Sequence, residues 1–442
     1  QIKQTVFGNN TERTKNVIDR SIKMAKLRYL DLFAGAGGLS EGFIRAGFTP
    51  VSHVEMDAAA CYTLKTRLAY KWLLNEGKSD IYDSYLRGEI TRNAFYAEVP
   101  ESLLSTVLNY EISWDNIEEV FQKIDDNLDG EKIDLIVGGP PCQAYSLIGR
   151  ARDENGMLGD KRNYLYKLYG EFLKKYRPKY FVFENVTGLL SAKDTDEKLH
   201  FDKMRALFQQ CGYKTEYKTL NAADYGVLQN RKRIILIGKY GDGEKFYPEI
   251  PKMERTYFVG EIFKDLPFLR AGGGSARPIE TKDYQGHYLY ESGIKQMNHQ
   301  MVTFHNARPN TEQDKEIYRI AVNLWNKEHK RLSYTDLPLH LQSQNNKESF
   351  LDRFKVVAAE LDCSQTVVAH ISKDGHYFIH PDILQNRSLT PREVARLQTF
   401  PDDYYFESVS GKPSRTTAYK QIGNAVPVCL AEKVAKALKE CW

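Results

Sequence analysis

The chain has 442 residues, of which 62 are Lys or Arg and 58 are Asp or Glu, so its formal net charge is +4. This length allows two or three domains and a substantial core. The small excess of positive charge permits a nucleic-acid partner, but any basic surface has to be local. Apolar runs stay well short of the ~20 residues of a membrane-spanning helix, and no secretory signal opens the chain, so we expect a cytoplasmic protein without a membrane partner.

The cysteines exclude the common zinc patterns. Six are present, and none of them forms a Cys-x-x-Cys pair or another zinc spacing. We therefore expect reduced thiols and no metal site. They are Cys61, Cys142, Cys211, Cys363, Cys429 and Cys441.

Apolar runs that resemble strands alternate with helical patterns through the first half of the chain. This order is typical of βαβ units and predicts an α/β fold with a mostly parallel sheet. Strands are expected at 28–33, 51–55, 133–137, 180–183, 215–220 and 233–237, and helices at 39–46, 58–73, 164–176 and 201–211.

Changes in composition suggest four parts of the chain. Residues 1–26 are polar and predict an N-terminal arm, and residues 27–240 predict a catalytic and cofactor-binding domain. A charged helical insertion at about 71–110 is expected to pack on its sheet. Residues 241–365 are rich in Gly, His, Asn, Gln and Tyr, and a smaller, loop-rich module is expected at 241–385. Residues 386–442 return to the first domain, with a helix capped by Thr390 and a terminal helix after Val426.

A glycine-rich turn after the first strand indicates a cofactor site. The turn runs from Phe33 through Gly35, Gly37 and Gly38 to Leu39, and glycines there allow close backbone approach to a ligand. Glu55 ends the second strand, where an acid binds ribose hydroxyls. Because the turn lacks the Gly-x-Gly-x-x-Gly spacing, S-adenosylmethionine suits it better than a dinucleotide. A purely structural tight turn is the alternative.

Cys142 follows the third long apolar run in the stretch Gly138-Gly139-Pro140-Pro141-Cys142-Gln143. A buried strand that stops there presents its next residues at the carboxyl edge of the sheet, where ligands bind in open α/β folds. Two prolines stiffen the backbone. A buried, inert thiol is the usual state of a cysteine, but this position favours a nucleophile.

An acid and two arginines are expected at the same edge. Glu184 ends the apolar run 180–183, and a carboxylate there is costly to bury unless it has a partner or a task. Arg231 and Arg233 precede the apolar run 234–237, and residues at alternate strand positions point to one face of the sheet. A capping glutamate and a solvated basic face are the alternatives.

These blocks together resemble the DNA (cytosine-5)-methyltransferases of bacterial restriction–modification systems. The resemblance covers nearly the whole chain in the family's order. It rests on Phe33-Ala34-Gly35-x-Gly37-Gly38, Gly139-Pro140-Pro141-Cys142-Gln143, Glu184-Asn185-Val186, Gln229-x-Arg231-x-Arg233, Arg387-x-Leu389-Thr390-x-Arg392-Glu393 and Gly423-Asn424-Ala425-Val426-Pro427.

The resemblance implies a Rossmann-like methyltransferase fold and covalent catalysis on cytosine. Cys142 would attack carbon 6, Glu184 would bind ring nitrogen 3, and Arg233, with Arg231 nearby, would contact the base oxygen. The base must leave the duplex to reach the thiol.

The resemblance also implies which residues bind S-adenosylmethionine. Glu55 would bind the ribose, Met56 would lie against the adenine, and Glu111 would meet the adenine amine. The remaining contacts would come from Phe33, Ala34, Gly35, Gly37, Gly38, Leu39, Pro140, Leu165, Asn424 and Val426.

The resemblance implies that duplex DNA is the partner. It also implies a monomer that acts beside a cognate restriction endonuclease. Residues 144–163 correspond to the family's mobile catalytic loop, with Gln143, Ser146 and Arg162 as DNA contacts. Residues 241–385 correspond to the target recognition domain. Side chains of the types that read base edges there are Gln300, His305, Asn306, Arg308 and the run 342–346.

Three alternatives stay open on the sequence alone. A tRNA-methylating branch of the family shares the fold and the cysteine. A non-catalytic DNA-binding member would be expected to lose Cys142 or Glu184, and both are present. An NAD-dependent dehydrogenase shares the fold class, but the first turn and the Pro-Pro-Cys block argue against it.

Overall fold

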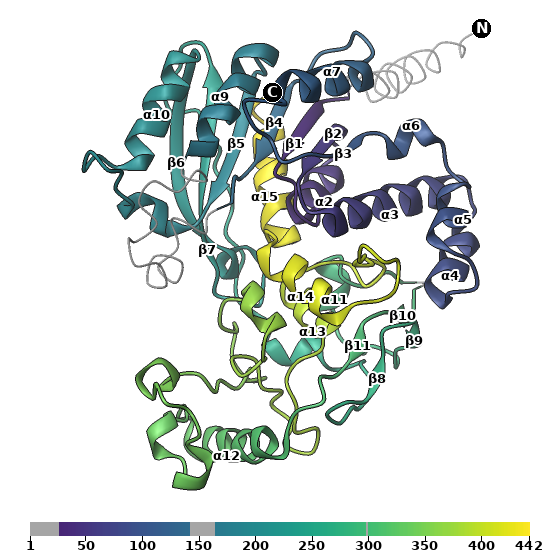
Figure 1. Ribbon diagram of the computed structural model, residues 1–442, viewed down its shortest axis with the longest axis vertical. Coiled ribbons are helices and arrows are strands. Elements are labelled where there is room, and N and C mark those ends of the chain that lie inside the picture. The colour runs from purple at the N-terminus through teal and green to yellow at the C-terminus, as the bar shows by residue number, and fades with distance from the viewer. Residues whose placement is uncertain (1–25, 142–163, 298) are drawn as a thin grey trace, which may run out of the picture.

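A seven-stranded sheet is the centre of the computed structural model, which describes residues 26–141, 164–297 and 299–442 (Figure 1). The strand order is β3-β2-β1-β4-β5-β7-β6. Neighbours from β3 to β5 are parallel, and β7 is antiparallel to both β5 and β6, which confirms the predicted mostly parallel sheet. The strands are β1 Arg28–Leu32, β2 Thr49–Glu55, β3 Val107–Asn109, β4 Leu135–Gly138, β5 Tyr180–Asn185, β6 Tyr213–Asn221 and β7 Lys232–Tyr240.

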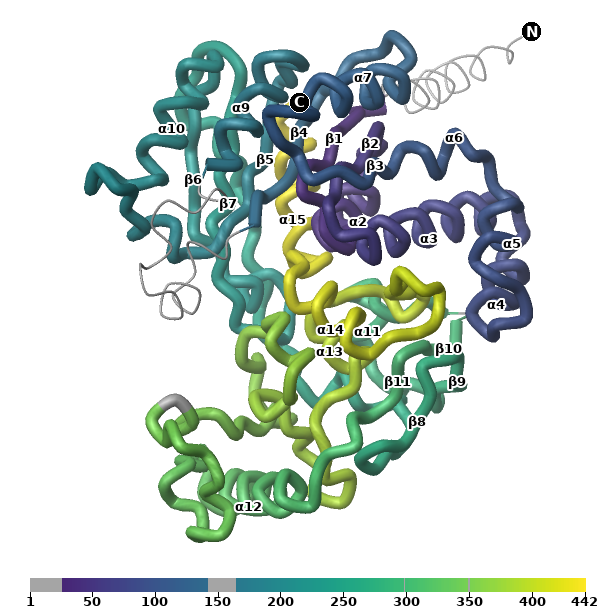
Figure 2. Tube along the Cα trace, viewed as in Figure 1, coloured from purple at the N-terminus to yellow at the C-terminus, as the bar shows by residue number. Residues whose placement is uncertain are grey.

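Helices cover both faces of this sheet. One apolar cluster joins the sheet to α7, α9 and α10, and a second joins the other face to α2 and α15. The terminal helix α15 lies directly beside α2, so the end of the chain returns to its first helix (Figure 2). The helices of this domain are α2 Gly38–Arg45, α3 Ala58–Asn75, α7 Ile117–Leu128, α9 Leu165–Tyr176, α10 His200–Gln210 and α15 Val428–Lys439.

All six predicted strands and the four early helices are present, within a few residues of the expected bounds. The edge strand β3 was missed because it has only three residues and follows a charged helical stretch. The helix capped by Thr390 is also confirmed: its hydroxyl accepts from the Glu393 backbone, and the Glu393 carboxylate accepts from the Thr390 backbone.

The segment at 71–110 does not pack on the sheet as expected. Its helices turn their aromatic side chains, such as Tyr82, Tyr85 and Phe95, into a third apolar cluster. This cluster is shared with α13 (Pro391–Leu397), α14 (Arg415–Asn424) and residues 259–304. Its last residues form β3, which is part of the sheet itself. The segment therefore bridges the cofactor domain and the region after β7. It contains α4 Ser79–Arg87, α5 Arg92–Tyr96 and α6 Glu101–Leu104.

Residues after β7 consist mostly of loops, short β pairs and short helices. A fourth cluster forms around α12 Glu312–Glu328 and lies at the far end of the molecule from the sheet (Figure 1). The other elements are β8 Gly274–Ser275, β9 Ile279–Glu280, β10 Met301–Val302, β11 His305–Asn306, α11 Tyr288–Glu291, α13 Pro391–Leu397 and α14 Arg415–Asn424. Among the described residues, no helix is both long and apolar enough to span a membrane.

A buried ionic network joins the cofactor domain to the segment that follows α13. The Arg67 guanidinium binds both Glu41 oxygens, at 2.9 and 2.6 Å, and an Asp403 oxygen at 2.7 Å. Burial alone would raise the pKa of both acids, but the Arg67 charge outweighs it and lowers the pKa of Glu41 and of Asp403 to about 2. Arg67 is thus the main cation of the network, while Arg45 and Lys71 lie 3.6 and 3.8 Å from Glu41 and contribute less.

Replacing Arg67 with methionine should lower the free energy of unfolding by about 3–5 kcal/mol, because it removes the main cation from two buried carboxylates. Urea unfolding at neutral pH measures this loss. The matched control is Arg255→Met: Arg255 also bridges two aspartates, Asp224 and Asp362, but at the surface, where the loss should be at most about 1 kcal/mol. Equal urea midpoints for the two variants would contradict the stabilising role assigned to Arg67.

The same network sets an acid limit on stability. The folded pKa of Glu41 and Asp403, about 2, lies below their unfolded values of about 4, so the unfolded chain takes up protons first. The stabilisation is therefore complete above about pH 4.5 and is lost as the pH falls toward about 2.

Candidate active site

The turn after β1 is shaped by left-handed backbone at three positions. Phe33, Gly35 and Gly37 have φ values of 58°, 55° and 81°. A Cβ on Gly37 would lie 2.7 Å from the Leu64 side chain, and one on Gly38 would lie 2.4 Å from the Val426 carbonyl oxygen. A Cβ on Gly35 would meet nothing within 4 Å. The turn is therefore packed against the protein at Gly37 and Gly38 and is open at Gly35, which leaves space for a ligand to approach its backbone.

Glu55 connects the end of β2 to this turn. Its carboxylate accepts hydrogen bonds from the Gly35 N–H at 2.7 Å and from the Asp57 N–H at 2.8 Å. Burial raises its pKa, and the two backbone donors partly oppose that rise. Each oxygen keeps a second lone pair, so the carboxylate can still accept from ribose hydroxyls.

The other predicted cofactor residues surround the same sheet edge. Met56 is 55% exposed beside Glu55, and Asn109 Nδ2 donates to the backbone carbonyls of both. Glu111 is exposed two residues after β3, and Asn424 is exposed at the end of α14. Ala34, Leu39, Pro140 and Val426 are buried, and Leu165 is half-buried at the start of α9.

Asp31 is a residue that the sequence reasoning missed. It lies within β1, its side chain is completely buried, and neither carboxylate oxygen has a hydrogen-bond partner in the described part of the chain. Burial, together with the negative charge of Glu55, raises its pKa. A buried acid inside an apolar run was the available signal.

Glu184 and Arg233 form the centre of the predicted catalytic site. Arg233 Nε lies 2.8 Å from Glu184 Oε1, and both side chains are about 15% exposed, so the pair is neither fully solvated nor sealed. The pairing follows from the sheet, since β7 runs antiparallel to β5 with Glu184 opposite Ile235. Both side chains thus lie where β5 ends and β7 begins.

The chain leading to Cys142 passes directly beside this pair. A Cβ on Gly139 would lie 2.3 Å from the Glu184 carbonyl oxygen and 2.9 Å from Glu184 Oε2. A Cβ on Gly138 would lie 2.0 Å from the Leu32 carbonyl oxygen. Both glycines are therefore required by close backbone approach. Asn185, another residue without a predicted role, donates to the Pro140 carbonyl at 3.3 Å and fixes the turn.

Cys142, Gln143, Ser146 and Arg162 lie outside the described residues. Their predicted roles as nucleophile and DNA contacts stay predictions. The described chain ends at Pro141 on one side of this gap and resumes at Tyr164.

Arg231 is placed differently from the expectation that both arginines point into the site. It precedes β7, is fully buried, and donates to the carbonyls of Val367, in the module after β7, and of Gly423 and Ala425. Gln229, also fully buried, accepts from the Val367 N–H at 2.8 Å and donates to Gln398. These side chains hold the module and the Asn424 segment against β7, so Arg231 is a positioning residue rather than one that faces the base.

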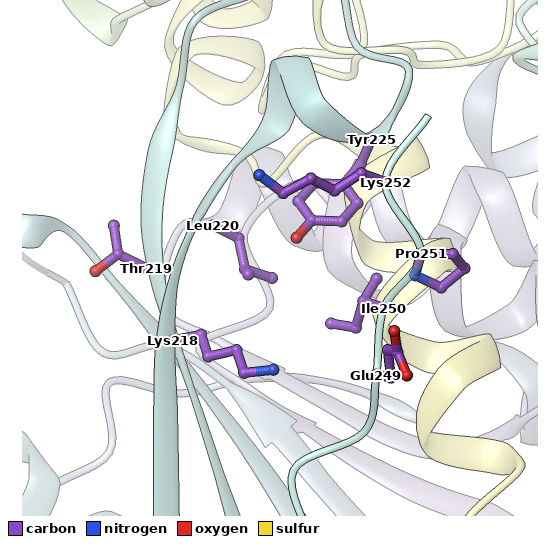
Figure 3. Close-up of a pocket in the computed structure, with 8 residues that line it drawn as sticks. All are labelled: Lys218, Thr219, Leu220, Tyr225, Glu249, Ile250, Pro251 and Lys252. Carbon is purple, nitrogen blue, oxygen red and sulfur yellow. The ribbon is translucent and has the colours of Figure 1, made fainter. Parts of the chain in front are cut away.

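A separate hollow of about 560 Å³ lies on the outer edge of the sheet. It is bounded by β6, by the turn at Tyr225 and by residues 249–252, with Lys218 on one side and the Tyr225 hydroxyl turned inward (Figure 3). None of the predicted catalytic or cofactor residues lines it, so we place the active site at the carboxyl edge of the strands instead.

Comparison with known proteins agrees with this geometry. The model of the C-5 cytosine-specific DNA methylase family matches residues 27–90 and 104–440. This chain belongs to that family. The unmatched stretch, 91–103, falls within the bridging segment, and the matched part contains the turn, the Glu184–Arg233 pair and the return segment. The protein is therefore a DNA cytosine-5 methyltransferase.

Similar proteins extend along nearly the whole chain. The type II methyltransferase M.Bpa9945I of Bacillus paralicheniformis is 39% identical, covering 93% of this chain and 98% of the relative. M1.HphI of Haemophilus parahaemolyticus is 29% identical over 93% of this chain and 86% of its own length. A solved structure of a predicted DNA modification methyltransferase from an Escherichia coli prophage has a TM-score of 0.61 at 22% identity, over 94% of this chain and 99% of that one. This last likeness shows the fold.

Proposed function

We propose that this methyltransferase transfers a methyl group from S-adenosylmethionine to carbon 5 of a cytosine that is flipped out of duplex DNA, through a covalent adduct with Cys142. The observation that carries the proposal is the Glu184–Arg233 pair, which packs against Gly139 just before Pro140, Pro141 and Cys142. An acid and a cation at this sheet edge, together with a thiol predicted to lie beside them, match the chemistry of addition to a pyrimidine.

The proposed reaction proceeds by addition and elimination. The Cys142 sulfur forms a bond to carbon 6, and the electron pair displaced from the ring double bond makes carbon 5 nucleophilic. Glu184 binds ring nitrogen 3 and provides a proton there, while Arg233 neutralises the base oxygen. After carbon 5 gains the methyl group, a base removes the proton from carbon 5, and the carbon 6–sulfur bond breaks to restore the double bond. The electron pair of that bond leaves with the Cys142 sulfur as thiolate, and ring nitrogen 3 returns its proton to Glu184.

The residues around the β1 turn fit S-adenosylmethionine. When bound, this cofactor supplies an electrophilic methyl group on a positively charged sulfur. Burial and the nearby charge of Glu55, at the end of β2, raise the pKa of Asp31 within β1, so a positively charged ligand beside these two acids would be favoured. Glu55 would hold the ribose, Met56 the adenine face, and Glu111 the adenine amine. The open side of Gly35 leaves room for the ligand.

We further propose that the protein acts in the cytoplasm as a monomer, with a restriction endonuclease of the same specificity as its functional partner. The names of its relatives, which are type II methyltransferases, support this setting. Residues 241–385 would form the target recognition domain, because the buried contacts of Val367 with Arg231 and Gln229 fix this module beside the site.

A trapping experiment tests the substrate and the adduct together. Duplex DNA of random sequence that carries 5-fluorocytosine is incubated with the enzyme and S-adenosylmethionine, and tRNA with the same base serves as the rival substrate. Because fluorine cannot leave carbon 5 as a proton does, the adduct should persist on DNA and map to Cys142 by mass spectrometry. Trapping on tRNA alone, or on another cysteine, would overturn the proposal.

A further inference from the structure

The module around α12 carries one polar loop that is held rigidly and yet presents its side chains outward. Residues 343–346, here named the recognition tip, follow the short helix Leu339–Leu341. Ser343, Gln344 and Asn345 are exposed, in contrast to the buried apolar cluster beneath them. In Figure 1 the loops after α12 project to the same side of the molecule as β6 and β7. The loops after α12 therefore lie on the side of the molecule where β7, the strand that carries Arg233, is found (Figure 1).

Other polar residues of this module are occupied in holding the fold. His305 is completely buried against the Pro267 carbonyl and the Thr390 hydroxyl. Arg308 donates to the carbonyls of Ile371 and Lys373. Gln300 donates to Asp283, and Asn306 lies in the β8–β11 pair with its amide oxygen buried. These four side chains are therefore poor candidates for reading bases.

Both ends of the tip are fixed by hydrogen bonds. Gln342 donates to the Leu337 carbonyl at 2.7 Å and accepts from Lys347 Nζ at 3.0 Å. These bonds close the loop at its base. Gln342 itself is therefore structural, although its residue type is one that reads DNA.

The middle of the tip is fixed to the core. The Gln344 N–H donates to the hydroxyl of the buried Tyr334 at 2.8 Å, and the Tyr334 ring stacks on Phe354. Gln313, on α12, donates to Ser343 Oγ at 3.0 Å. The backbone of the tip is thus held in place before any ligand binds, which reduces the entropy lost on binding.

The side chains of Gln344 and Asn345 make no hydrogen bond within the described part of the chain, and both are exposed. A carboxamide offers a donor and an acceptor side by side, the arrangement that matches N6 and N7 of adenine in the major groove. We infer that Gln344 and Asn345 determine sequence specificity by reading base edges that flank the methylated cytosine. This inference rests on the proposed action on duplex DNA.

The test compares target preferences rather than activity alone. Purified wild-type enzyme, Gln344→Ala and Asn345→Ala methylate a duplex library with random sequence, and bisulfite sequencing gives the preference at each position. Each variant should relax one or two flanking positions by about tenfold or more, while the methylated cytosine stays the same. Exposed residues of the other domain provide matched controls, Gln209→Ala on α10 and Asn93→Ala on α5, and should leave every position unchanged.

A third variant separates positioning from direct contact. Tyr334→Phe removes the hydroxyl that accepts from Gln344 but keeps the stacked ring, so it should relax the same position as Gln344→Ala by a smaller factor at an unchanged melting temperature. An unchanged preference in both tip variants would overturn the inference. A uniform loss of rate across all sequences would also overturn it, because it would mark a phosphate contact. A wild-type enzyme that methylates tRNA and no duplex would instead refute the proposed function, and the inference with it.

Discussion

Replacing Cys142 with alanine is expected to abolish methyl transfer, by at least about 10⁴-fold as for other covalent nucleophiles, while duplex DNA is still bound. The described chain leads Gly139 against Glu184 and fixes the Pro140 carbonyl through Asn185, so the residues that follow start from a rigid point. Radiolabelled methyl transfer measures the loss, and a gel-shift assay with target duplex measures binding.

Four of the other five cysteines are poorly suited to replace this thiol. Cys61, Cys211 and Cys429 are buried, and burial raises the pKa of each, that of Cys61 to about 12, so none of them is a ready thiolate. The half-exposed Cys363 provides the control: burial and its contact with Asp362 raise its pKa to about 11, and Cys363→Ala should methylate as the wild type does. Transfer that persists in Cys142→Ala would refute the covalent mechanism.

The sheet was predictable because its strands carry strong local signals. Runs such as 180–183 and 234–237 are apolar on both faces, as central strands of a covered sheet must be. β3 carries no such signal: it has three residues at the sheet edge, and its place depends on pairing with β2. The packing of the bridging helices was predicted wrongly. An amphipathic pattern shows that one face of a helix is buried, but it does not show which part of the protein covers that face.

The sequence blocks that form the site could be predicted, but the role of each side chain within them could not. Arg231 and Arg233 are of one type and two positions apart, yet one binds three backbone carbonyls and the other pairs with Glu184. That difference arises from tertiary packing of Val367 and Gly423 against the start of β7. The same holds in the module after β7, where His305 and Arg308 resemble DNA-reading residues and are used to hold loops together.

Replacing Glu184 with glutamine should lower kcat by about 10²–10⁴-fold, the usual contribution of a positioned acid or base. The amide keeps the size of the side chain and an oxygen that can accept from Arg233, so the site should stay assembled. What it loses is the capacity to provide a proton to ring nitrogen 3 as Cys142 adds to carbon 6. Single-turnover methyl transfer with saturating DNA and cofactor isolates this step.

The matched control for this change is Glu216→Gln on β6. Glu216 is also a strand glutamate with hydrogen bonds inside the protein, since it accepts from the Lys245 and Tyr247 N–H groups, but it lies outside the site. Its variant should keep the wild-type kcat. If Glu184 only held Arg233 in place, Glu184→Gln would keep most of its rate, because the amide oxygen can still accept that hydrogen bond. A large loss of kcat with unchanged DNA affinity would instead show that the carboxyl group takes part in the proton transfer on the base.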